Sequence, residues 1–286
     1  MSRIAIIGGG HMGEALLGGL LRAGHQVKDL VLAERAPERA DYLSKTFSVR
    51  IAPIADAVEN VAVVILAVKP ADVEAVTIEI GEAAGRADGN AVEQVIVSVV
   101  AGITTGFFES RLPAGSPVIR VMANAPALVG AGVTALAKGR FASAEQLSEA
   151  AALFGCVGGV LTVPEAQLDA VTAVSGSGPA YFFLFVEALV DAAVASGLSR
   201  PVATELAVQT MAGSAAMLLE HTDSEHVDPS GRPDTTAAEL RALITSPGGT
   251  TAAGLRELER GGVRAAVAAA VDAAKTRSEQ LGITTE

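Results

Sequence analysis

Hydroxyl side chains and two glycines gather in one short stretch late in the chain, Thr245–Thr251. Pro247 and Gly248 fit the central positions of a type II turn, because proline presets φ and glycine supplies a positive φ. An amphipathic segment follows, and Thr250 or Thr251 is its expected N-cap. Backbone N–H groups exposed at a helix start attract anions. The stretch fits an anion-binding site or an ordinary capped turn, and taken alone it favours the capped turn.

This stretch could bind a substrate but offers no reactive group of its own, so its chemistry depends on a second site elsewhere in the chain. The hydroxyls of Ser246, Thr250 and Thr251 surround the turn, and Gly249 leaves the next N–H groups open to a ligand such as a substrate carboxylate. The four histidines show no triad or metal-ligand spacing, and Cys156 is the single cysteine. We therefore predict no metal site and expect a bound nucleotide to supply the difficult chemistry.

A glycine-rich motif at the start of the chain predicts that nucleotide site. The segment Gly8–Gly13 follows the apolar run at 4–7 and precedes an amphipathic segment, which is the context that the pattern G-x-G-x-x-G requires. Gly8 would make a tight turn, Gly10 would let the backbone approach a pyrophosphate, and Gly13 would let helix and strand pack closely. The alternative is a glycine-rich turn in a protein that binds no nucleotide.

Two charged residues after the second predicted strand, at 30–33, bear on the cofactor. An acidic side chain such as Glu34 usually binds the ribose hydroxyls of NAD, whereas an arginine such as Arg35 accommodates the extra phosphate of NADP. Arg35 could also be a solvated surface charge. The pair leaves the choice between NADP(H) and NAD(H) open.

Apolar runs alternate with amphipathic segments through the first half of the chain, and the expected strands lie at 4–7, 30–33, 49–52, 61–67, 95–100, 118–122, 133–135 and 160–163. This alternation predicts an α/β fold with a Rossmann-like, mainly parallel sheet. Ligands bind beyond the carboxyl ends of such strands. Val68–Pro70, Ala101–Gly102 and Asn124 lie there. Lys69 would reach a ribose or phosphate, or would be a surface lysine at a strand end.

The pattern changes after Pro164, where the strand-like runs stop. Helices are expected near 180–196, 201–220, 237–244, 251–260 and 263–280, and a mobile loop at 221–236. We predict a Rossmann domain over 1–164 and an all-α domain over 165–286. The helix at 180–196 is apolar on nearly every face, which favours an obligate homo-oligomer over burial in a monomer. Its apolar run, Ala180–Ala195, is expected to be too short for a membrane span.

Composition excludes several classes of function. The chain has 286 residues, half of them hydrophobic, and a formal net charge of −11, so nucleic acid and anionic membranes are poor partners. With one cysteine and no visible targeting segment, a reducing cytoplasm is the expected location.

Four motifs together resemble pyrroline-5-carboxylate reductases, and the resemblance spans essentially the whole chain. They are Ile7–Gly13, Ala67–Pro70, Val174–Tyr181 and Thr245–Thr251. The last two are specific in combination, whereas the first is common to many dehydrogenases. The resemblance implies hydride transfer from NAD(P)H to the C=N carbon of 1-pyrroline-5-carboxylate, giving L-proline in the last step of proline biosynthesis. It also implies a C-terminal dimerisation domain and a homodimer, with a decamer of five dimers as a further assembly left open.

The same resemblance assigns roles to residues. Thr251 would donate a hydrogen bond to the imine nitrogen, Ser246 and the amides near Gly249 and Thr250 would hold the carboxylate, and Glu165 would line the proline pocket. The resemblance slightly favours NADP(H) as the cofactor and leaves NAD(H) as the alternative. The expected cofactor-binding residues are Ile7, Gly8, Gly9, Gly10, His11, Met12, Gly13, Glu34, Arg35, Ala67, Val68, Lys69, Pro70, Val100, Ala101, Gly102 and Asn124.

One loop departs from the family pattern. Where the family usually has Met-Pro-Asn-Thr-Pro, this chain has Met122, Ala123, Asn124, Ala125 and Pro126. A rigid proline and a hydroxyl are lost, which is expected to affect cofactor affinity. Two other hypotheses therefore stand beside the reductase. One is a nucleotide-binding regulator without turnover, and the other is a reductase of a related cyclic imine acid.

Overall fold

The computed structural model describes residues 3–86, 93–221 and 236–283. Nearly all of the loop predicted at 221–236 lies outside these residues. The strands form one sheet and are β1 (Ile4–Ile7), β2 (Leu30–Ala33), β3 (Arg50–Ile51), β4 (Val63–Leu66), β5 (Val95–Ser98), β6 (Val118–Ala123), β7 (Gly132–Lys138) and β8 (Gly158–Thr162). Each corresponds to a run predicted from the sequence.

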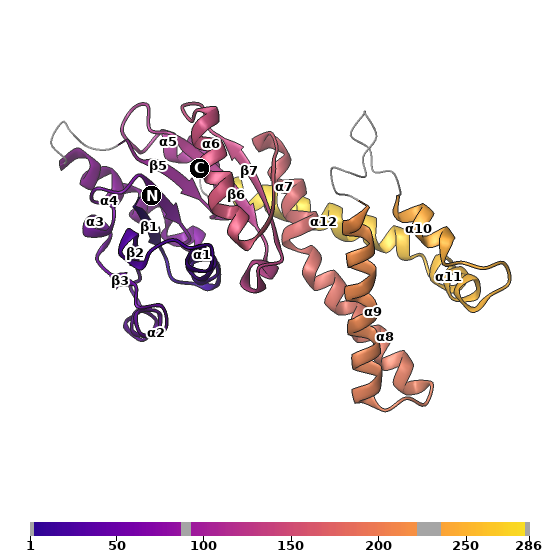
Figure 1. Ribbon diagram of the computed structural model, residues 1–286. Coiled ribbons are helices and arrows are strands. Elements are labelled where there is room, and N and C mark those ends of the chain that lie inside the picture. Colours follow the sequence, from indigo (N-terminus) through magenta and orange to yellow (C-terminus); the bar gives the residue numbers. More distant parts are fainter. Residues whose placement is uncertain (1–2, 87–92, 222–235, 284–286) are drawn as a thin grey trace. The chain divides into compact units, whose positions relative to one another are not determined.

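The strand order is β3-β2-β1-β4-β5-β6-β7-β8 (Figure 1). Every neighbouring pair is parallel except β6 and β7, so the predicted mainly parallel sheet is confirmed. From β1 the chain builds outward to β2 and β3, and from β4 it builds in the opposite direction. Ligands of open α/β sheets bind where the strand order reverses, at the carboxyl ends of the strands. The topology therefore predicts a ligand-binding site at the carboxyl ends of β1 and β4.

Helices and short helical turns cover both faces of this sheet. They are α1 (His11–Arg22), η1 (Val27–Asp29), α2 (Pro37–Phe47), α3 (Ile54–Ala57), η2 (Pro70–Asp72), α4 (Val73–Arg86), α5 (Thr105–Glu109), η3 (Ala125–Val129), α6 (Ala144–Phe154), η4 (Gly155–Val157), η5 (Glu165–Gln167), α7 (Leu168–Val171) and η6 (Thr172–Gly176), the last a π-helical turn. One core contains Leu16, Leu20 and Phe154, and the other contains Val73 and Phe108. Because β1, β2 and β4 are buried on both faces, their sequences are continuous apolar runs, and the equally buried β5 departs from this only at Ser98.

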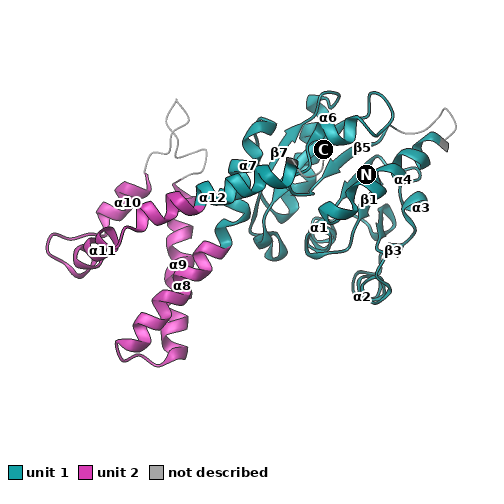
Figure 2. Cartoon of the chain, turned by 180° about the vertical axis from the view of Figure 1, so that it is seen from behind, with its two compact units in different colours: residues 1–179, 271–286 teal, residues 180–270 magenta. Residues whose placement is uncertain are grey.

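The remaining helices are α8 (Gly178–Ala195), α9 (Arg200–Glu220), α10 (Ala237–Leu243), α11 (Thr250–Arg260) and α12 (Val263–Ile283). The chain divides into two compact units, one of residues 1–179 with 271–286 and one of residues 180–270 (Figure 2). The first, the sheet unit, therefore includes the last part of α12. The second, the helical unit, contains helices alone among its described residues. The boundary expected between 164 and 165 stays a prediction, because it divides the chain by role rather than by contacts.

A polar cluster holds the end of α12 within the sheet unit. Arg120 of β6 is 6% exposed, and its guanidinium lies 3.5 Å from the carboxylate of Glu165 and 3.8 Å from that of Asp169. Ser278 of α12 donates a hydrogen bond of 2.6 Å to Asp169 Oδ1. Glu165 also accepts from the backbone N–H and the hydroxyl of Thr105, each at 2.7 Å. One buried arginine thus connects β6 with the segments that contain Glu165 and Asp169, and through Asp169 with α12.

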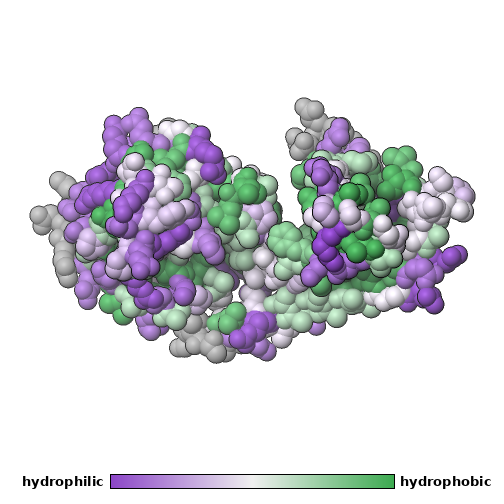
Figure 3. Space-filling view, turned by 90° about the horizontal axis from the view of Figure 1, so that it is seen from below, coloured by the Kyte–Doolittle hydropathy of each residue, from purple (hydrophilic) through white to green (hydrophobic). Residues whose placement is uncertain are grey.

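The helical unit exposes much apolar surface, visible in green in Figure 3. On α8, Phe182, Phe183 and Leu184 are 61%, 68% and 65% exposed, so the chain itself does not bury this helix. The continuous helical path Glu165–Ala195 and the helix Arg200–Glu220 have the length and hydropathy of a membrane span. The expectation that the first is too short was wrong, because the helix continues N-terminally through η5, α7 and η6. Either another protein surface or a membrane would have to cover these side chains.

Candidate active site

The glycine loop at the carboxyl end of β1 has the geometry that the motif predicted. Gly8 has φ of +104°, and a Cβ there would lie 2.5 Å from the carbonyl oxygen of Ala67. A Cβ on Gly13 would lie 2.0 Å from the carbonyl oxygen of Gly8, so α1 and the loop approach closely only because Gly13 has no side chain. A Cβ on Gly10 would meet no described heavy atom within 4 Å. Gly10 therefore leaves open space at the N-terminus of α1, where a pyrophosphate fits.

Side chains from the next two elements hold this loop in place. Glu34, directly after β2, accepts hydrogen bonds of 2.8 Å from the N–H of Gly9 and from that of Ala36. Arg39 of α2 donates from Nε to the carbonyl oxygen of Gly9 at 2.7 Å, and its guanidinium pairs with Glu14 at 2.5 Å. Both backbone groups of Gly9 are thus bound to side chains, which keeps the loop ordered beside the open helix end.

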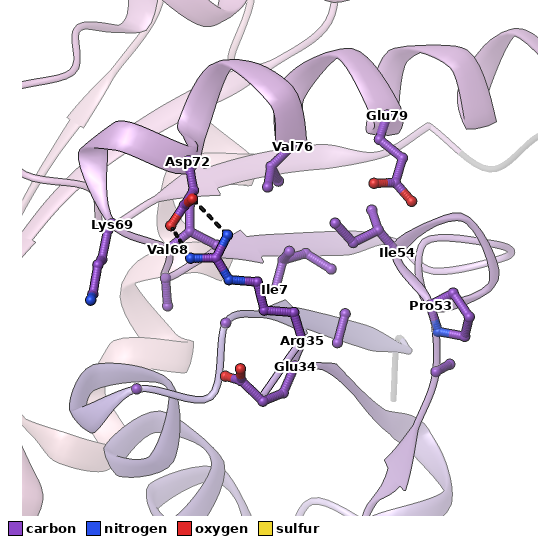
Figure 4. Close-up of a pocket in the computed structure, with 15 residues that line it drawn as sticks. Ile7, Glu34, Arg35, Pro53, Ile54, Val68, Lys69, Asp72, Val76 and Glu79 are labelled. Atoms are coloured by element: carbon purple, nitrogen blue, oxygen red, sulfur yellow. Dashed lines mark hydrogen bonds and ion pairs between the residues drawn. The ribbon is translucent and has the colours of Figure 1, made fainter. Parts of the chain in front are cut away.

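A cavity of about 340 Å³ lies beside this loop (Figure 4). Eight predicted cofactor-binding residues line it: Ile7, Gly8, Gly10, Glu34, Arg35, Ala67, Val68 and Lys69. Seven further lining residues were not predicted as cofactor-binding: Ala52, Pro53, Ile54, Asp72, Val76, Glu79 and Ala33, the last of which ends β2. Ala52, Pro53 and Ile54 follow β3, the strand next to β2. They could have been predicted as lining residues, because they lie at the carboxyl end of a strand that the sequence predicts. Asp72, Val76 and Glu79 lie on the segment after β4.

The cavity lies on the β2 and β3 side of the point where strand order reverses. In Rossmann folds the residue after the second strand contacts the adenosine ribose. Since Glu34 and Arg35 line this cavity, it fits the adenosine half of a dinucleotide. Arg35 reaches across it to Asp72, with two hydrogen bonds of 2.7 and 3.0 Å (Figure 4). The sequence left the roles of Glu34 and Arg35 open. In the structure they bind different partners, Glu34 the glycine loop and Arg35 the carboxylate of Asp72.

The predicted residues after β5 and β6 lie outside this cavity. Gly102 has φ of +77° and is buried, and a Cβ there would lie 3.3 Å from Leu281 of α12. Asn124 is 8% exposed, donates to the carbonyl oxygen of Ser175 at 3.1 Å and accepts from the N–H of Val133 at 2.9 Å. Its amide anchors the loop in which the family's proline and threonine are replaced. Gly9, His11, Met12, Gly13, Pro70, Val100 and Ala101 likewise do not line the cavity.

The helical unit contains the predicted turn. The N–H of Gly249 donates to the carbonyl oxygen of Ser246 at 3.0 Å, and Gly248 has φ of +70°, as a type II turn requires. The N-cap of α11 is Gly249, which accepts the first helical hydrogen bond from Ala253 at 3.1 Å. The expectation of a threonine N-cap was therefore wrong. Thr250 and Thr251 form the first turn of the helix, and a glycine N-cap offers no side chain to the N–H groups there.

Glu165 lies in the sheet unit, where Thr105 and Arg120 bind its carboxylate. Within the described residues, no group of three or more His, Cys, Asp or Glu side chains could hold a metal ion. Burial raises the pKa of the Cys156 thiol, which donates to the carbonyl oxygen of Leu153 at 2.8 Å. This cysteine is therefore a poor nucleophile.

Known families match both parts of the chain. A family model described as pyrroline-5-carboxylate reductase dimerisation matches residues 165–281, and one described as NADP oxidoreductase, coenzyme F420-dependent, matches residues 3–102. The pyrroline-5-carboxylate reductase of Mycobacterium tuberculosis (strain ATCC 25618 / H37Rv) is 68% identical over 100% of this chain and 99% of its own length. That of Corynebacterium melassecola is 43% identical over 99% of each chain.

Solved structures agree with these sequence relatives. A pyrroline-5-carboxylate reductase from Coxiella burnetii is 32% identical with a TM-score of 0.87, over 98% of each chain. The pyrroline carboxylate reductase of Plasmodium falciparum, solved with NADP bound, is 27% identical with a TM-score of 0.82, again over 98% of each chain. The similarity therefore extends over both units.

Proposed function

The chain belongs to the pyrroline-5-carboxylate reductase family, and from that premise we propose which of its residues bind the cofactor and the substrate. Its activity is the NAD(P)H-dependent reduction of 1-pyrroline-5-carboxylate to L-proline, the last step of proline biosynthesis. In this reaction the reduced nicotinamide, when bound, supplies a hydride to the carbon of the C=N bond.

The cofactor is assigned to the sheet unit. The first turn of α1 and the open space at Gly10 take the pyrophosphate, and the cavity beside Glu34 and Arg35 takes the adenosine half. Lys69, which is exposed at the cavity, contributes a positive charge toward a phosphate. The nicotinamide half is assigned to the segments after β5 and β6, Val100–Gly102 and Asn124. The place of the adenosine half and the pyrophosphate is supported by one observation. A cavity lies at the carboxyl ends of the strands, beside a helix N-terminus without a side-chain cap.

The substrate is assigned to the turn before α11. Ser246 and the N–H of Thr250, directly after the N-cap Gly249, hold the carboxylate, because a helix N-terminus without a side-chain cap attracts an anion. Thr251 donates a hydrogen bond to the imine nitrogen and so favours the arrangement in which the C=N carbon accepts hydride. Glu165, positioned by Thr105 and Arg120, lines the proline pocket. These groups bind and orient the substrate rather than form covalent bonds to it.

The role of Thr251 is tested by substituting valine, which keeps the shape and removes the hydroxyl. We expect Thr251→Val to lower kcat at least about 100-fold, within the range for losing a positioned hydrogen-bond donor, while ADP-ribose binding measured by calorimetry stays unchanged. Thr245→Val is the matched control, because the Thr245 hydroxyl already donates to the carbonyl oxygen of Arg241 at 2.5 Å. Normal turnover in Thr251→Val would contradict the assignment.

The assembly and location follow from the same premise. A dimer formed through the region of 165–281 would cover the apolar side chains of α8, which favours a protein surface over a membrane as their partner. A decamer of five dimers and a cytoplasmic location are further parts of this proposal. Light scattering of the purified protein tests the decamer, because ten chains of 28.8 kDa differ plainly from two.

The two other hypotheses from the sequence lose their support. Ala123 and Ala125 suggested a regulator without turnover, but Asn124 anchors their loop through two hydrogen bonds. Full-length identity of 68% to pyrroline-5-carboxylate reductases also favours that substrate over another cyclic imine acid.

A further inference from the structure

The cavity proposed for the adenosine half contains an ion pair to which the proposed hydride transfer assigns no role. Arg35 and Asp72 are bound through two parallel hydrogen bonds, Nη1 to Oδ1 at 2.7 Å and Nη2 to Oδ2 at 3.0 Å, across 37 positions of sequence. Both side chains line the cavity (Figure 4). Their charges are therefore placed where the group that distinguishes NADPH from NADH, the 2′-phosphate, would approach.

The planar guanidinium fork of an arginine matches a carboxylate and a phosphate equally well, so the two anions compete for it. Asp72 occupies the fork of Arg35 in this structure. The pair is not a strong one, because the side chain of Arg35 is 77% exposed and that of Asp72 is 27% exposed. Solvent screens exposed ion pairs, so they contribute little to stability. A phosphate, which carries more charge than a carboxylate, could therefore displace Asp72 from Arg35 at low cost.

The other charged groups that line the cavity do not hold Arg35. Glu34 accepts hydrogen bonds through both oxygens, from the N–H groups of Gly9 and Ala36, and makes no pair with Arg35 within the described residues. Glu79 lines the far part of the cavity near Ile54, and Lys69 extends from the segment after β4 (Figure 4). Of the three carboxylates that line the cavity, Asp72 is therefore the one that would compete with an incoming phosphate for the guanidinium of Arg35.

We propose that Asp72 determines how strongly this enzyme discriminates between NADPH and NADH, by competing with the 2′-phosphate of the cofactor for the guanidinium of Arg35. Asp72 is here a specificity-determining residue that acts through Arg35. NADH has no phosphate at this position and leaves the pair intact. The inference rests on the assignment of the cavity to the adenosine half of the cofactor.

The test measures binding of two probes by calorimetry, ADP-ribose and 2′-phospho-ADP-ribose, in a double-mutant cycle. We expect Asp72→Asn to tighten 2′-phospho-ADP-ribose about threefold to tenfold, which is roughly 0.6–1.4 kcal/mol, and to leave ADP-ribose unchanged. Arg35→Ala should weaken 2′-phospho-ADP-ribose selectively. In the Arg35→Ala background, adding Asp72→Asn should have no further effect, because the competition no longer exists.

The matched control is Glu79→Gln, which removes a carboxylate from the same cavity without touching Arg35. An equal gain in Glu79→Gln, or a gain from Asp72→Asn that persists without Arg35, would show general charge repulsion and overturn the proposal. An Asp72→Asn variant with unchanged melting temperature and unchanged selectivity would overturn it too. If the unsubstituted protein binds neither probe, the assignment of the cavity itself is wrong, which is a different result.

Discussion

Two glycines of the same motif serve different purposes at the residue scale. Gly13 allows α1 to pack against the loop, since any Cβ there would overlap the carbonyl oxygen of Gly8. Gly10 faces open space, which leaves clear the position that we propose for the pyrophosphate. The first requirement belongs to folding and the second to binding, so substitutions can separate them.

We expect Gly13→Ala to lower the free energy of unfolding by about 3 kcal/mol or more, because the clash is with backbone and overpacked sites cost about 1–3 kcal/mol even where side chains can move. Gly10→Ala should cost about 1 kcal/mol or less, as the loss of a favourable N-cap. It should nevertheless weaken ADP-ribose binding about tenfold, roughly 1.4 kcal/mol. Denaturant unfolding and calorimetry check the pair. Equal stability of both variants would contradict this division of roles.

At the scale of elements, the cluster around Arg120 explains how the chain end returns to the sheet unit. Arg120 is on β6, Asp169 is on α7 and Ser278 is on α12, so three elements meet at one arginine and its carboxylates. Buried charges are stable only when paired. The cluster therefore acts as a unit, and removing Arg120 takes the same guanidinium away from both carboxylates.

We expect Arg120→Met to lower the free energy of unfolding by about 2–4 kcal/mol. This is somewhat below the ~3–5 kcal/mol for breaking a fully buried pair, because Glu165 and Asp169 are about a quarter exposed. Hydrogen exchange should show faster opening near Ser278. The control Lys45→Ala breaks an exposed pair with Asp41 on α2, involves no residue of the cluster, and should leave the free energy of unfolding almost unchanged. Similar losses in both variants would rule out a special role for Arg120.

At the scale of the whole molecule, α8 is the helix whose large apolar side chains most need a partner surface. Its side chains are exposed within one chain, and the matching family model describes dimerisation. Burying such a face contributes about 25 cal/mol for each Å² of apolar surface removed from water. A charge in the middle of that face would have to lose its hydration when two chains associate.

We therefore expect Phe183→Asp to shift the protein from dimer or larger assembly to monomer or aggregate, measured by light scattering after size exclusion. Phe141→Asp is the control, because Phe141 is an exposed aromatic of the sheet unit. ADP-ribose binding should survive in soluble Phe183→Asp, since the cavity lies within the sheet unit. An unchanged assembly in Phe183→Asp would contradict the role of α8.

Local sequence patterns were sufficient to predict much of the fold of this protein. The buried parallel strands, the glycine loop and the turn at Ser246–Gly249 could be predicted because each depends on neighbouring residues, through continuous burial or a positive φ. The apolar sequence of α8 also indicated an oligomer. The N-cap of α11 was predicted one or two positions too late, because hydroxyl side chains favour caps but the turn hydrogen bond from Gly249 to Ser246 fixes where the helix begins.

The tertiary structure alone decided which distant side chains meet. Arg35 and Asp72 are 37 positions apart, and Thr105 and Glu165 are 60 apart. Their pairing depends on the strand order and on how each connecting segment turns, which no local periodicity records. For this reason the sequence left Arg35 ambiguous and gave no indication of Asp72, whereas the fold places the two across one cavity.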